Sequence, residues 1–406
     1  MAVGEENWQD LPLIKGLKLG VAKAGIKYPD RDDLAVMLLC EGTTVAGVFT
    51  QNAFAAAPVD ICRQHLSKGR IRAMVVNSGN ANACTGDEGA RAALQSCEAL
   101  AKLTNATTEE VLPFSTGVIG ELLPIEKIEA ALPEAVSSAS ESQWADFANA
   151  IMTTDTRPKG SSASFEWEGN TINVSGVSKG SGMINPNMAT MLAYVATDAA
   201  VSSDILSELS LLAANKSFNR ITIDGDTSTN DASMLIATGA GSAPLISDKN
   251  SPLYEKLAAA VIEVNQSLAK QIVEDGEGAT KFVTVEVNGG HDEKECFDVA
   301  YAIAHSPLVK TAMFAADPNW GRIVAAIGYS GVDALDANKV RVWLDDVAIV
   351  ESGGKATSYK EEDGQRIFDQ ERFTIKVDLG RGDASELLWT TDLSHEYIRI
   401  NAEYRS

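Results

Sequence analysis

Short segments rich in β-branched and aromatic residues recur along the whole chain, and segments of helical periodicity lie between them. Segments of this kind, about four to eight residues long, are typical of strands. We find them at residues 34–39, 71–79, 165–176, 221–226, 282–287, 339–344 and 372–379. Their spread predicts sheet in most parts of the chain.

Three other segments carry apolar residues at the spacing of one helix face. They cover residues 141–152, 202–218 and 251–275. In the first, the shared face holds Trp144, Phe147, Ala148 and Ile151. Serine stands at or near the start of the other two, as at a helix N-cap. The chain is therefore predicted to be a mixed α/β protein, and no repeat or low-complexity linker marks a domain boundary in it.

The composition limits the class of partner. The chain has 406 residues, 45% of them hydrophobic, which is enough for a large core in two domains or one extended α/β unit. Lys and Arg number 34 against 56 Asp and Glu, a formal charge of −22. Such a molecule repels phosphate backbones and anionic lipid surfaces. We therefore expect no nucleic acid and no membrane as partner, although one local basic pocket for a carboxylate is compatible with this charge.

The cysteines and the first residues indicate the compartment. The cysteines are odd in number and form no C-x-x-C pair, which fits neither a disulfide framework nor a zinc site. Residues 1–20 carry acids where a secretory signal has a basic start, and no apolar run approaches membrane-spanning length. We expect a cytoplasmic protein.

Several common catalytic motifs are missing. No P-loop is present, and the histidines lie in neither a G-x-S-x-G nor an H-E-x-x-H context, which disfavours serine and zinc hydrolases. "DGDTSTND", residues 224–231, resembles the start of a calcium loop, but Leu235 occupies the position where a bidentate Glu is required. We predict a hydrogen-bonded turn there and no metal.

The stretch "KGSGMINPNMATML", residues 179–192, leads through a glycine- and proline-containing turn into an apolar run. An acyl-transfer enzyme without a histidine base can use a Thr whose own free α-amine accepts the proton. The pKa of such an amine is about 8, close to the working pH. Attack of the Thr190 hydroxyl on the Ala189 carbonyl, followed by ester hydrolysis, would create that amine. The alternative is that Thr190 is an ordinary half-buried residue after a loop.

A second stretch, "LPFSTGVIGE" at residues 112–121, offers groups for the same chemistry. Acyl transfer needs hydrogen-bond donors aimed at the developing oxyanion. The Thr116 hydroxyl and the Gly117 N–H can supply two. The alternative for these residues is a tight turn after a strand.

Taken together, these stretches resemble the ornithine acetyltransferase family of the arginine pathway, also called bifunctional glutamate N-acetyltransferase. The resemblance covers almost the entire chain. Its landmarks are "NSGNANACTG" from Asn77, "STGVIG" from Ser115, "IMTTDTRPK" from Ile151, "KGSGMINPNMATML" from Lys179, "SFNRITIDGDTSTND" from Ser217, "EDGEGATKF" from Glu274, "DPNWGRI" from Asp317 and the terminal "NAEYRS".

The resemblance implies self-cleavage between Ala189 and Thr190, which would give an alpha chain of residues 1–189 and a beta chain of residues 190–406. It implies a ping-pong reaction in which Thr190 takes acetyl from N2-acetyl-L-ornithine and L-glutamate accepts it. No metal or bound cofactor is needed, and acetyl-CoA enters only as a possible second donor. The implied fold has sandwiched sheets flanked by helices, similar to self-processing aminopeptidases. Two alpha and two beta chains are expected to form a heterotetramer.

The family's site residues carry over onto matching motifs. The oxyanion donors fall on Thr116 and Gly117. Substrate contacts fall on Thr153, Lys179, Thr190, Glu277, Asn401 and Ser406, with Thr154 a close alternative to Thr153. Lys179 suits the carboxylate of an acetylated amino acid, and Glu277 suits the side-chain ammonium of ornithine. Ser406 stands where many relatives have Thr, and Ala232 follows "TSTND" where another Thr is expected.

Two rival functions remain open from the sequence. One is a Thr-nucleophile amidase or aminopeptidase of related fold, in which water rather than an amine resolves the acyl-enzyme. Such an enzyme would release acetate at a rate that does not change when glutamate is added. The other is a binding protein in which "MATML" is only core, which would leave the chain uncut on denaturing electrophoresis.

Overall fold

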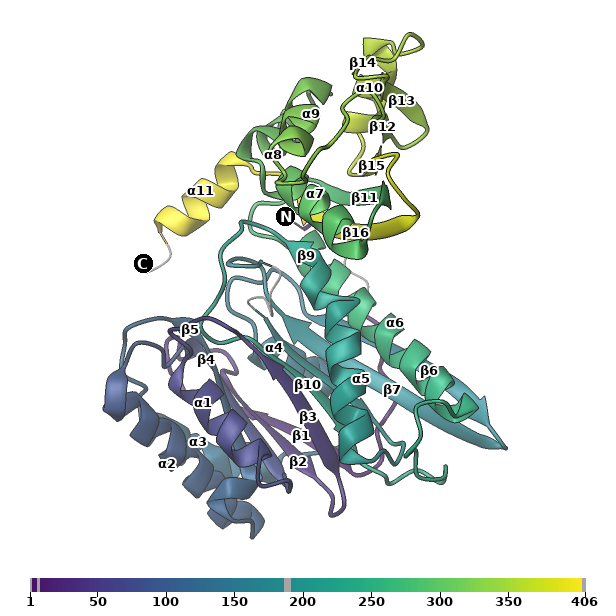
Figure 1. Ribbon diagram of the computed structural model, residues 1–406. Coiled ribbons are helices and arrows are strands. Elements are labelled where there is room, and N and C mark those ends of the chain that lie inside the picture. Colours follow the sequence, from purple (N-terminus) through teal and green to yellow (C-terminus); the bar gives the residue numbers. More distant parts are fainter. Residues whose placement is uncertain (1, 6–7, 186–190, 404–406) are drawn as a thin grey trace. The chain divides into compact units, whose positions relative to one another are not determined.

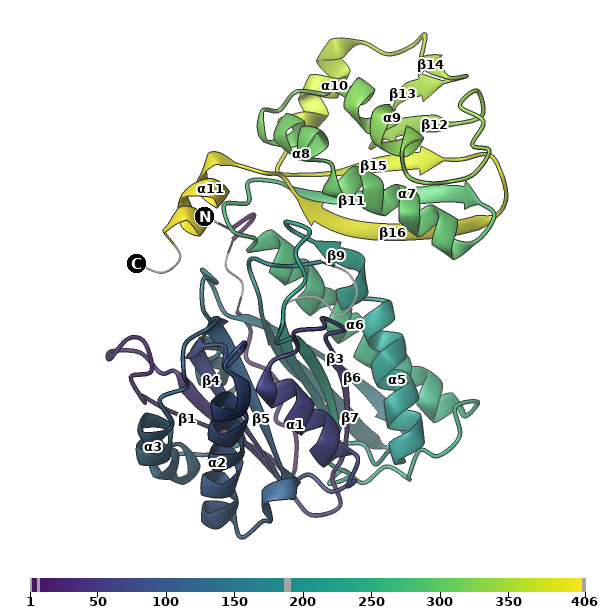
Figure 2. The same cartoon turned by 60° about the vertical axis from the view of Figure 1, so that its left-hand side comes forward.

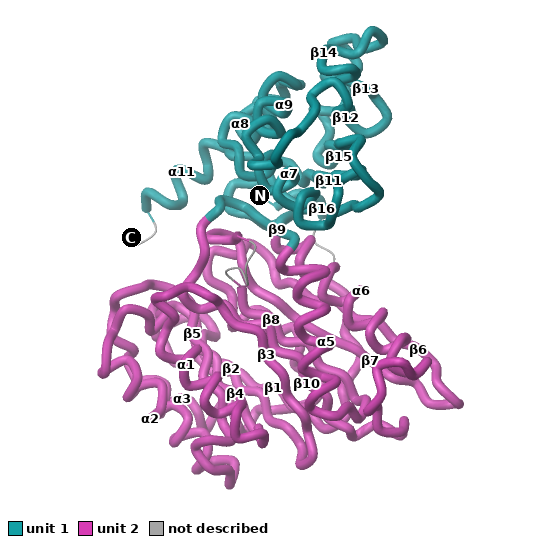
Figure 3. Tube along the Cα trace, viewed as in Figure 1, with its two compact units in different colours: residues 1–6, 220–225, 273–406 teal, residues 7–219, 226–272 magenta. Residues whose placement is uncertain are grey.

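The computed structural model describes residues 2–5, 8–185 and 191–403. The chain divides into two compact units (Figure 3). Residues 7–219 and 226–272 form one, here called the sandwich unit. Residues 1–6, 220–225 and 273–406 form the other, here called the C-terminal unit. Ala189 and Thr190, between which cleavage is expected, are among the residues assigned to the sandwich unit.

Two sheets make up the centre of the sandwich unit (Figure 1). One has the strand order β1-β2-β4-β5, with β4 and β5 parallel and the other pairs antiparallel. The second has the order β3-β10-β8-β7-β6, with β8 and β10 parallel. The strands are β1 (Leu17–Ala22), β2 (Leu34–Leu39), β3 (Thr44–Phe49), β4 (Ala73–Asn80), β5 (Val111–Val118), β6 (Lys159–Trp167), β7 (Asn170–Lys179), β8 (Leu192–Thr197) and β10 (Ala232–Ala237).

Helices cover the outer faces of both sheets. α2 and α3 pack on the four-stranded sheet through residues such as Cys97, Leu100 and Leu132, and α5 and α6 lie against the five-stranded sheet (Figure 2). The prediction of sheets sandwiched between helices is therefore confirmed. The helices are α1 (Ala57–Leu66), α2 (Gly86–Thr104), α3 (Ile125–Ser137), α4 (Trp144–Ala150), α5 (Ser203–Asn215) and α6 (Pro252–Glu274), with short 3-10 turns at Thr108–Glu110 and Phe218–Arg220.

The inner faces of the two sheets share one apolar core with α4. Tyr194 of β8 lies edge-on to Phe114 of β5, with ring centroids 5.3 Å apart, and edge-on to Phe147 of α4 at 5.4 Å. Edge-to-face pairs of this kind contribute about 0.5–1.5 kcal/mol beyond the burial of their area. The predicted apolar face of 141–152 is confirmed, since all four of its residues are buried in this core.

The C-terminal unit contains one mixed sheet of the order β14-β13-β12-β15-β11-β16-β9. Its strands are β9 (Ile221–Thr222), β11 (Phe282–Gly290), β12 (Arg341–Leu344), β13 (Val347–Glu351), β14 (Gly354–Lys355), β15 (Arg372–Asp378) and β16 (Ala384–Thr391). Its helices are α7 (Glu293–His305), α8 (Pro307–Phe314), α9 (Trp320–Gly328), α10 (Glu361–Phe368) and α11 (His395–Ala402).

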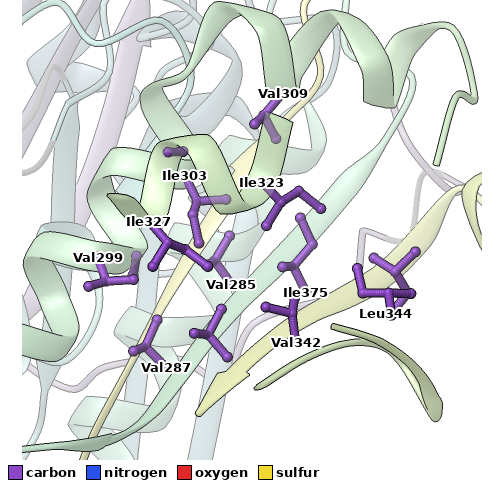
Figure 4. Packing of buried hydrophobic residues seen from close by; sticks show 14 of the residues in the cluster. Val285, Val287, Val299, Ile303, Val309, Ile323, Ile327, Val342, Leu344 and Ile375 are labelled. Atoms are coloured by element: carbon purple, nitrogen blue, oxygen red, sulfur yellow. The ribbon is translucent and has the colours of Figure 1, made fainter. Parts of the chain in front are cut away.

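The core of this unit is built from alternate residues of its central strands, whose side chains point to the same face of the sheet. In β15 every second residue is buried, and β11 runs parallel to it with Val285 opposite Ile375. Because alternate side chains of a strand point to one face, these residues form a continuous apolar surface. Helices α7 and α9 cover it with Val299, Ile303 and Ile323 (Figure 4).

Two of the predicted strands differ from the structure. The segment 165–176 is a hairpin rather than one strand, because Glu168 and Gly169 both adopt positive φ, of 48° and 80°, and reverse the chain between β6 and β7. The segment 221–226 pairs with β16 only at Ile221 and Thr222. Among the described residues, no helix combines the length and apolar character needed to cross a membrane.

We expect His305 to make the stability of the C-terminal unit sensitive to acid. Its Nε2 lies 2.7 Å from the Thr222 hydroxyl, and its ring lies on Tyr301 with centroids 3.8 Å apart. Burial, and then the positive charge of Lys310, lower the pKa of His305 from 6.5 to about 4. The unfolded chain therefore takes up this proton at a higher pH than the folded one, so stability present above pH 6.5 is lost as the pH falls toward 4.

We expect His305→Gln to reduce this acid sensitivity. Between about pH 7 and about pH 4.5 the free energy of unfolding should fall by roughly 1–2 kcal/mol less in the variant than in the unsubstituted protein. Urea denaturation at the two pH values measures the difference. An equal fall in both proteins would show that His305 takes no part in it.

Candidate active site

The motif expected to contain the nucleophile connects two neighbouring strands. Ala189 and Thr190 lie outside the described residues, but both flanking strands are described. β7 ends at Lys179 and β8 begins at Leu192, and these two residues face each other in the antiparallel pair. Since β8 and β7 are interior strands of the five-stranded sheet, both ends of the motif are fixed by hydrogen-bonded neighbours.

Two buried carboxylates hold the backbone at the two ends of this motif. Gly180 donates its N–H to Asp155 Oδ1 over 2.7 Å, and Met191 donates its N–H to Asp231 Oδ1 over 2.9 Å. Both aspartates are buried. The backbone on either side of the expected cleavage point therefore has a defined position.

The expected oxyanion donors lie inside a strand rather than in a turn. Thr116 and Gly117 belong to β5 and pair with Ser78 and Gly79 of β4. The alternative of a tight turn after a strand is therefore wrong. Gly117 has a φ of 135°, which side chains rarely allow, and this breaks the regular pleat where β4 also shifts register. Two landmark motifs, "NSGNANACTG" and "STGVIG", thus lie side by side.

Lys179 brings two of the predicted site residues together. Its Nζ donates to the Thr153 hydroxyl over 2.8 Å and to the Thr116 hydroxyl over 3.2 Å. The lysine is only 6% exposed. Of the two adjacent threonines considered for substrate contact, it is therefore Thr153 whose hydroxyl the ammonium holds. These three groups come from β5, from the loop after α4 and from the end of β7.

Asp155 pairs with two lysines of this cluster. Its Oδ1 accepts from Lys159 Nζ at 2.6 Å, and its Oδ2 lies 3.8 Å from Lys179 Nζ. Burial alone would raise the pKa of Asp155, but the positive charges of Lys159 and Lys179 and the hydrogen bonds from Lys159 and Gly180 outweigh it and hold the pKa well below its ordinary value. Asp155 is therefore an ionised carboxylate between two lysines.

The pKa of Asp231 is shifted in the opposite direction to that of Asp155. Burial raises its pKa well above the ordinary value, and the Met191 N–H, the Lys179 charge and the Ser228 hydroxyl offset this only in part. Its Oδ2 has no hydrogen-bond partner in the described part of the chain. This carboxyl can therefore hold a proton next to the backbone of the residue that follows Thr190.

The loop predicted as a hydrogen-bonded turn joins the same region. The Asn230 N–H donates to the Ser228 hydroxyl at 3.0 Å, and the Asn230 amide donates to the carbonyls of Ala81 and Ser115 at 2.6 and 2.8 Å. Asn230 therefore ties the "TSTND" motif to β5 and to the residue that follows β4. Within residues 2–5, 8–185 and 191–403, no three His, Cys, Asp or Glu side chains are grouped as metal ligands.

In the C-terminal unit, Glu277 and Asn401 form a pair. The Asn401 amide in α11 donates to Glu277 Oε2 over 2.7 Å, and Glu277 is 7% exposed. Gly278 permits this approach, because a Cβ there would lie 2.5 Å from the Tyr397 nitrogen and 2.6 Å from the Ser394 hydroxyl oxygen. The Ser394 side chain caps α11 and also donates to the Gly278 carbonyl. The first turn of α11 is thus held on the glutamate loop.

The predicted residues fall into three sets. Thr116, Thr153 and Lys179 meet in the sandwich unit, with Gly117 next to Thr116 in β5, and Glu277 and Asn401 meet in the C-terminal unit. Ala189, Thr190 and Ser406 lie outside the described residues. The partners Asp155, Lys159 and Asp231 were not predicted from the sequence, although all three stand in landmark motifs. Their place in these motifs was the available signal, but residue type does not show burial.

Comparisons with known proteins agree with these landmarks. The ArgJ family model matches residues 18–406. Two curated proteins, each named arginine biosynthesis bifunctional protein ArgJ, are 56% identical (Pseudomonas fluorescens) and 57% identical (Pseudomonas syringae pv. tomato) over 406 residues, which is 100% of both chains in each case.

Solved structures are similar over parts of the chain. The arginine biosynthesis bifunctional protein argJ of Bacillus halodurans is 36% identical with a TM-score of 0.48, covering 50% of this chain and 95% of its own. The ornithine acetyltransferase of Mycobacterium tuberculosis, complexed with ornithine, is 35% identical with a TM-score of 0.39, covering 44% and 95%. The L-aminopeptidase D-Ala-esterase/amidase of Ochrobactrum anthropi is 10% identical with a TM-score of 0.41, covering 67% and 89%.

The family resemblance expected from the sequence is thereby confirmed. The family model covers nearly all of the chain, and the two Pseudomonas proteins align with it from end to end. This chain belongs to the ArgJ family of bifunctional arginine biosynthesis proteins.

Proposed function

We propose that this protein transfers the acetyl group of N2-acetyl-L-ornithine to L-glutamate through an acetyl ester on Thr190. The observation that carries the proposal is the meeting of Lys179, Thr116 and Thr153 at the end of the strand that leads into the Thr190 motif. This meeting gathers hydroxyl groups and one positive charge, which are groups that can bind an acylated amino acid. Membership of a family of arginine biosynthesis proteins supports the choice of substrates.

The first step of the proposal is self-cleavage. The Thr190 hydroxyl attacks the Ala189 carbonyl, the C–N bond breaks, and the proton of the hydroxyl ends on the released amine. Water then hydrolyses the Ala189 ester and leaves Thr190 with a free α-amine and a free hydroxyl. Both groups needed for nucleophilic catalysis then belong to one residue.

Acetyl transfer uses the same two groups. The α-amine takes the hydroxyl proton as Oγ attacks the acetyl carbonyl of the donor, and the collapse of the tetrahedral intermediate releases ornithine with that proton on its amine. The α-amine of glutamate then attacks the acetyl ester and restores the Thr190 hydroxyl. Thr116 and Gly117 are the proposed donors to the oxyanion of both steps, and such a donor is worth about 10²–10³ in kcat.

We assign the recognition of the charged groups of the substrate to two residues. Lys179 attracts the substrate carboxylate, and Thr153 adds a hydroxyl beside it. Glu277, held by Asn401, is proposed to bind the side-chain ammonium of the ornithine moiety. We also propose that Ser406 contributes a substrate contact, that the alpha and beta chains form a heterotetramer of two of each, and that acetyl-CoA can serve as a second acetyl donor.

Glu277→Gln provides a test of the ammonium contact. Since glutamate has no side-chain ammonium, the substitution should raise KM for N-acetylornithine about tenfold and change the glutamate half-reaction much less. Half-reaction kinetics measure both. Glu286→Gln is a matched control, because Glu286 also accepts from an asparagine amide, that of Asn288 at 2.7 Å. Equal effects on the two half-reactions would remove Glu277 from ornithine recognition.

The reaction itself is tested by incubating the protein with N-acetylornithine, with and without glutamate. We expect N-acetylglutamate and ornithine in equal amounts when glutamate is present, and little acetate. Acetate release that glutamate does not change would instead establish a Thr-nucleophile amidase. An uncut chain that binds the amino acids without turnover would establish a binding protein.

A further inference from the structure

We infer that the buried group Lys159–Asp155–Lys179 is a positioning unit that makes the Thr116 and Thr153 hydroxyls donate their hydrogen bonds to the substrate. The inference rests on the proposed function and concerns residues of the sandwich unit that are all described. Asp155 and Lys159 act in it through Lys179 and are positioning residues.

The hydrogen bonds between Lys179 and the two threonine hydroxyls have a fixed direction. An ammonium donates and cannot accept, whereas a threonine hydroxyl has one proton and can do either. Thr116 Oγ1 at 3.2 Å and Thr153 Oγ1 at 2.8 Å must therefore accept from Lys179 Nζ. Each hydroxyl then keeps its own proton for another acceptor. An oxyanion donor needs this orientation before the reaction begins, because preorganised donors lose nothing to reorientation in the transition state.

Asp155 anchors the ammonium of Lys179. The side chain of Asp155 is 0% exposed and uses both oxygens. Oδ1 accepts from Lys159 Nζ at 2.6 Å and from the Gly180 N–H at 2.7 Å, and Oδ2 accepts from the Thr153 N–H at 3.0 Å. One carboxylate therefore holds the backbone beside both groups that meet, Thr153 and Lys179. The position of the ammonium relative to the hydroxyls depends on it.

Two buried lysines share Asp155, with Lys159 completely buried and Lys179 nearly so. Charges interact strongly in such a low-dielectric setting. The Lys179 ammonium beside the two hydroxyls therefore favours an anionic group of the substrate there, a carboxylate or the developing oxyanion.

The experiment is a double-mutant cycle between Asp155→Asn and Thr116→Val. Asparagine keeps the size of the side chain but removes the charge that holds the two lysines. Each single substitution should lower kcat about 10²-fold with KM changed less than about threefold. If Asp155 works through the Thr116 hydroxyl, the double variant should be no worse than about threefold below Thr116→Val. Losses that multiply would overturn the inference.

Asp198→Asn is the matched control. Asp198 is also buried, also accepts a backbone N–H, that of Asn173 at 3.1 Å, and follows the opposite end of β8. It should retain kcat within about twofold, and a loss equal to that of Asp155→Asn would contradict a special role for Asp155. Circular dichroism and urea unfolding of all variants show whether a variant loses activity because it is unfolded or because a folded protein has its hydroxyl groups misplaced.

A second cycle keeps the inference testable if Asp155→Asn does not fold. Lys179→Gln replaces a group that only donates by an amide that can also accept, so the Thr116 hydroxyl is no longer forced to donate. Lys179→Gln and Thr116→Val should again show losses in kcat that do not multiply. Unsubstituted protein that transfers no acetyl would overturn the proposed function, whereas normal transfer with multiplying losses would overturn this inference alone.

Discussion

Replacing Thr190 with alanine should leave the chain uncut and lower acetyl transfer by about 10⁴-fold or more. The effect is large because one residue is assigned the nucleophile, the base and the cleavage of its own peptide bond. Losing its hydroxyl removes all three at once. Denaturing electrophoresis reports the cleavage, and the N-acetylornithine and glutamate assay reports the transfer.

Thr190→Ser is the matched control for this prediction, since it keeps the hydroxyl and the site of the future amine. It should be cut and should retain transfer, at a reduced rate. The two outcomes together separate loss of chemistry from loss of fold. Normal turnover by Thr190→Ala would end the assignment of the nucleophile.

The second large effect is expected for Gly117→Ala. A Cβ at this position would lie 2.3 Å from the carbonyl carbon of Gly79 and 2.6 Å from the nitrogen of Asn80. These are backbone atoms of the neighbouring strand, so they cannot move without opening the β4–β5 pair. The φ of 135° adds strain for any side chain. We expect a loss of about 3 kcal/mol or more in the free energy of unfolding, together with displacement of the backbone N–H that is the proposed oxyanion donor.

Gly120→Ala is the control that has backbone strain without a steric clash. Gly120 has a φ of 85°, and a Cβ there would meet nothing within 4 Å. Its substitution should cost only about 1–2 kcal/mol, the ordinary penalty of a side chain in a left-handed conformation. Urea denaturation of both variants gives the comparison. Equal losses would show that the close approach of the two strands at Gly117 is not a constraint.

The spacing of apolar residues predicted those strands and helices whose own side chains form the buried face. The segment 34–39 became β2, 282–287 became most of β11, and 372–379 contains all of β15, because branched residues at these positions face a core. The helical segments 202–218 and 251–275 contain α5 and α6. The hairpin at 165–176 was missed although Gly169 and Asn170 are typical turn residues, and the positive φ of Glu168 carries no signal in its residue type.

The candidate site depended on contacts between distant motifs. Thr116, Thr153 and Lys179 were assigned from the family resemblance, and no local pattern shows that their side chains meet. Asp155 and Asp231 were missed because a buried aspartate and an aspartate in a solvated turn have the same sequence appearance. Their burial and their opposite pKa shifts arise only from the residues folded around them.

We propose that a chain of this sequence exposes the amine of Thr190 and uses its hydroxyl as the acetyl carrier. Mass spectrometry of an active preparation, before and after brief exposure to N-acetylornithine without glutamate, tests both halves together. We predict a fragment that begins at Thr190 and gains one acetyl group on that residue, which glutamate then removes. An active preparation with no such fragment, or with acetyl on another residue, would contradict the account.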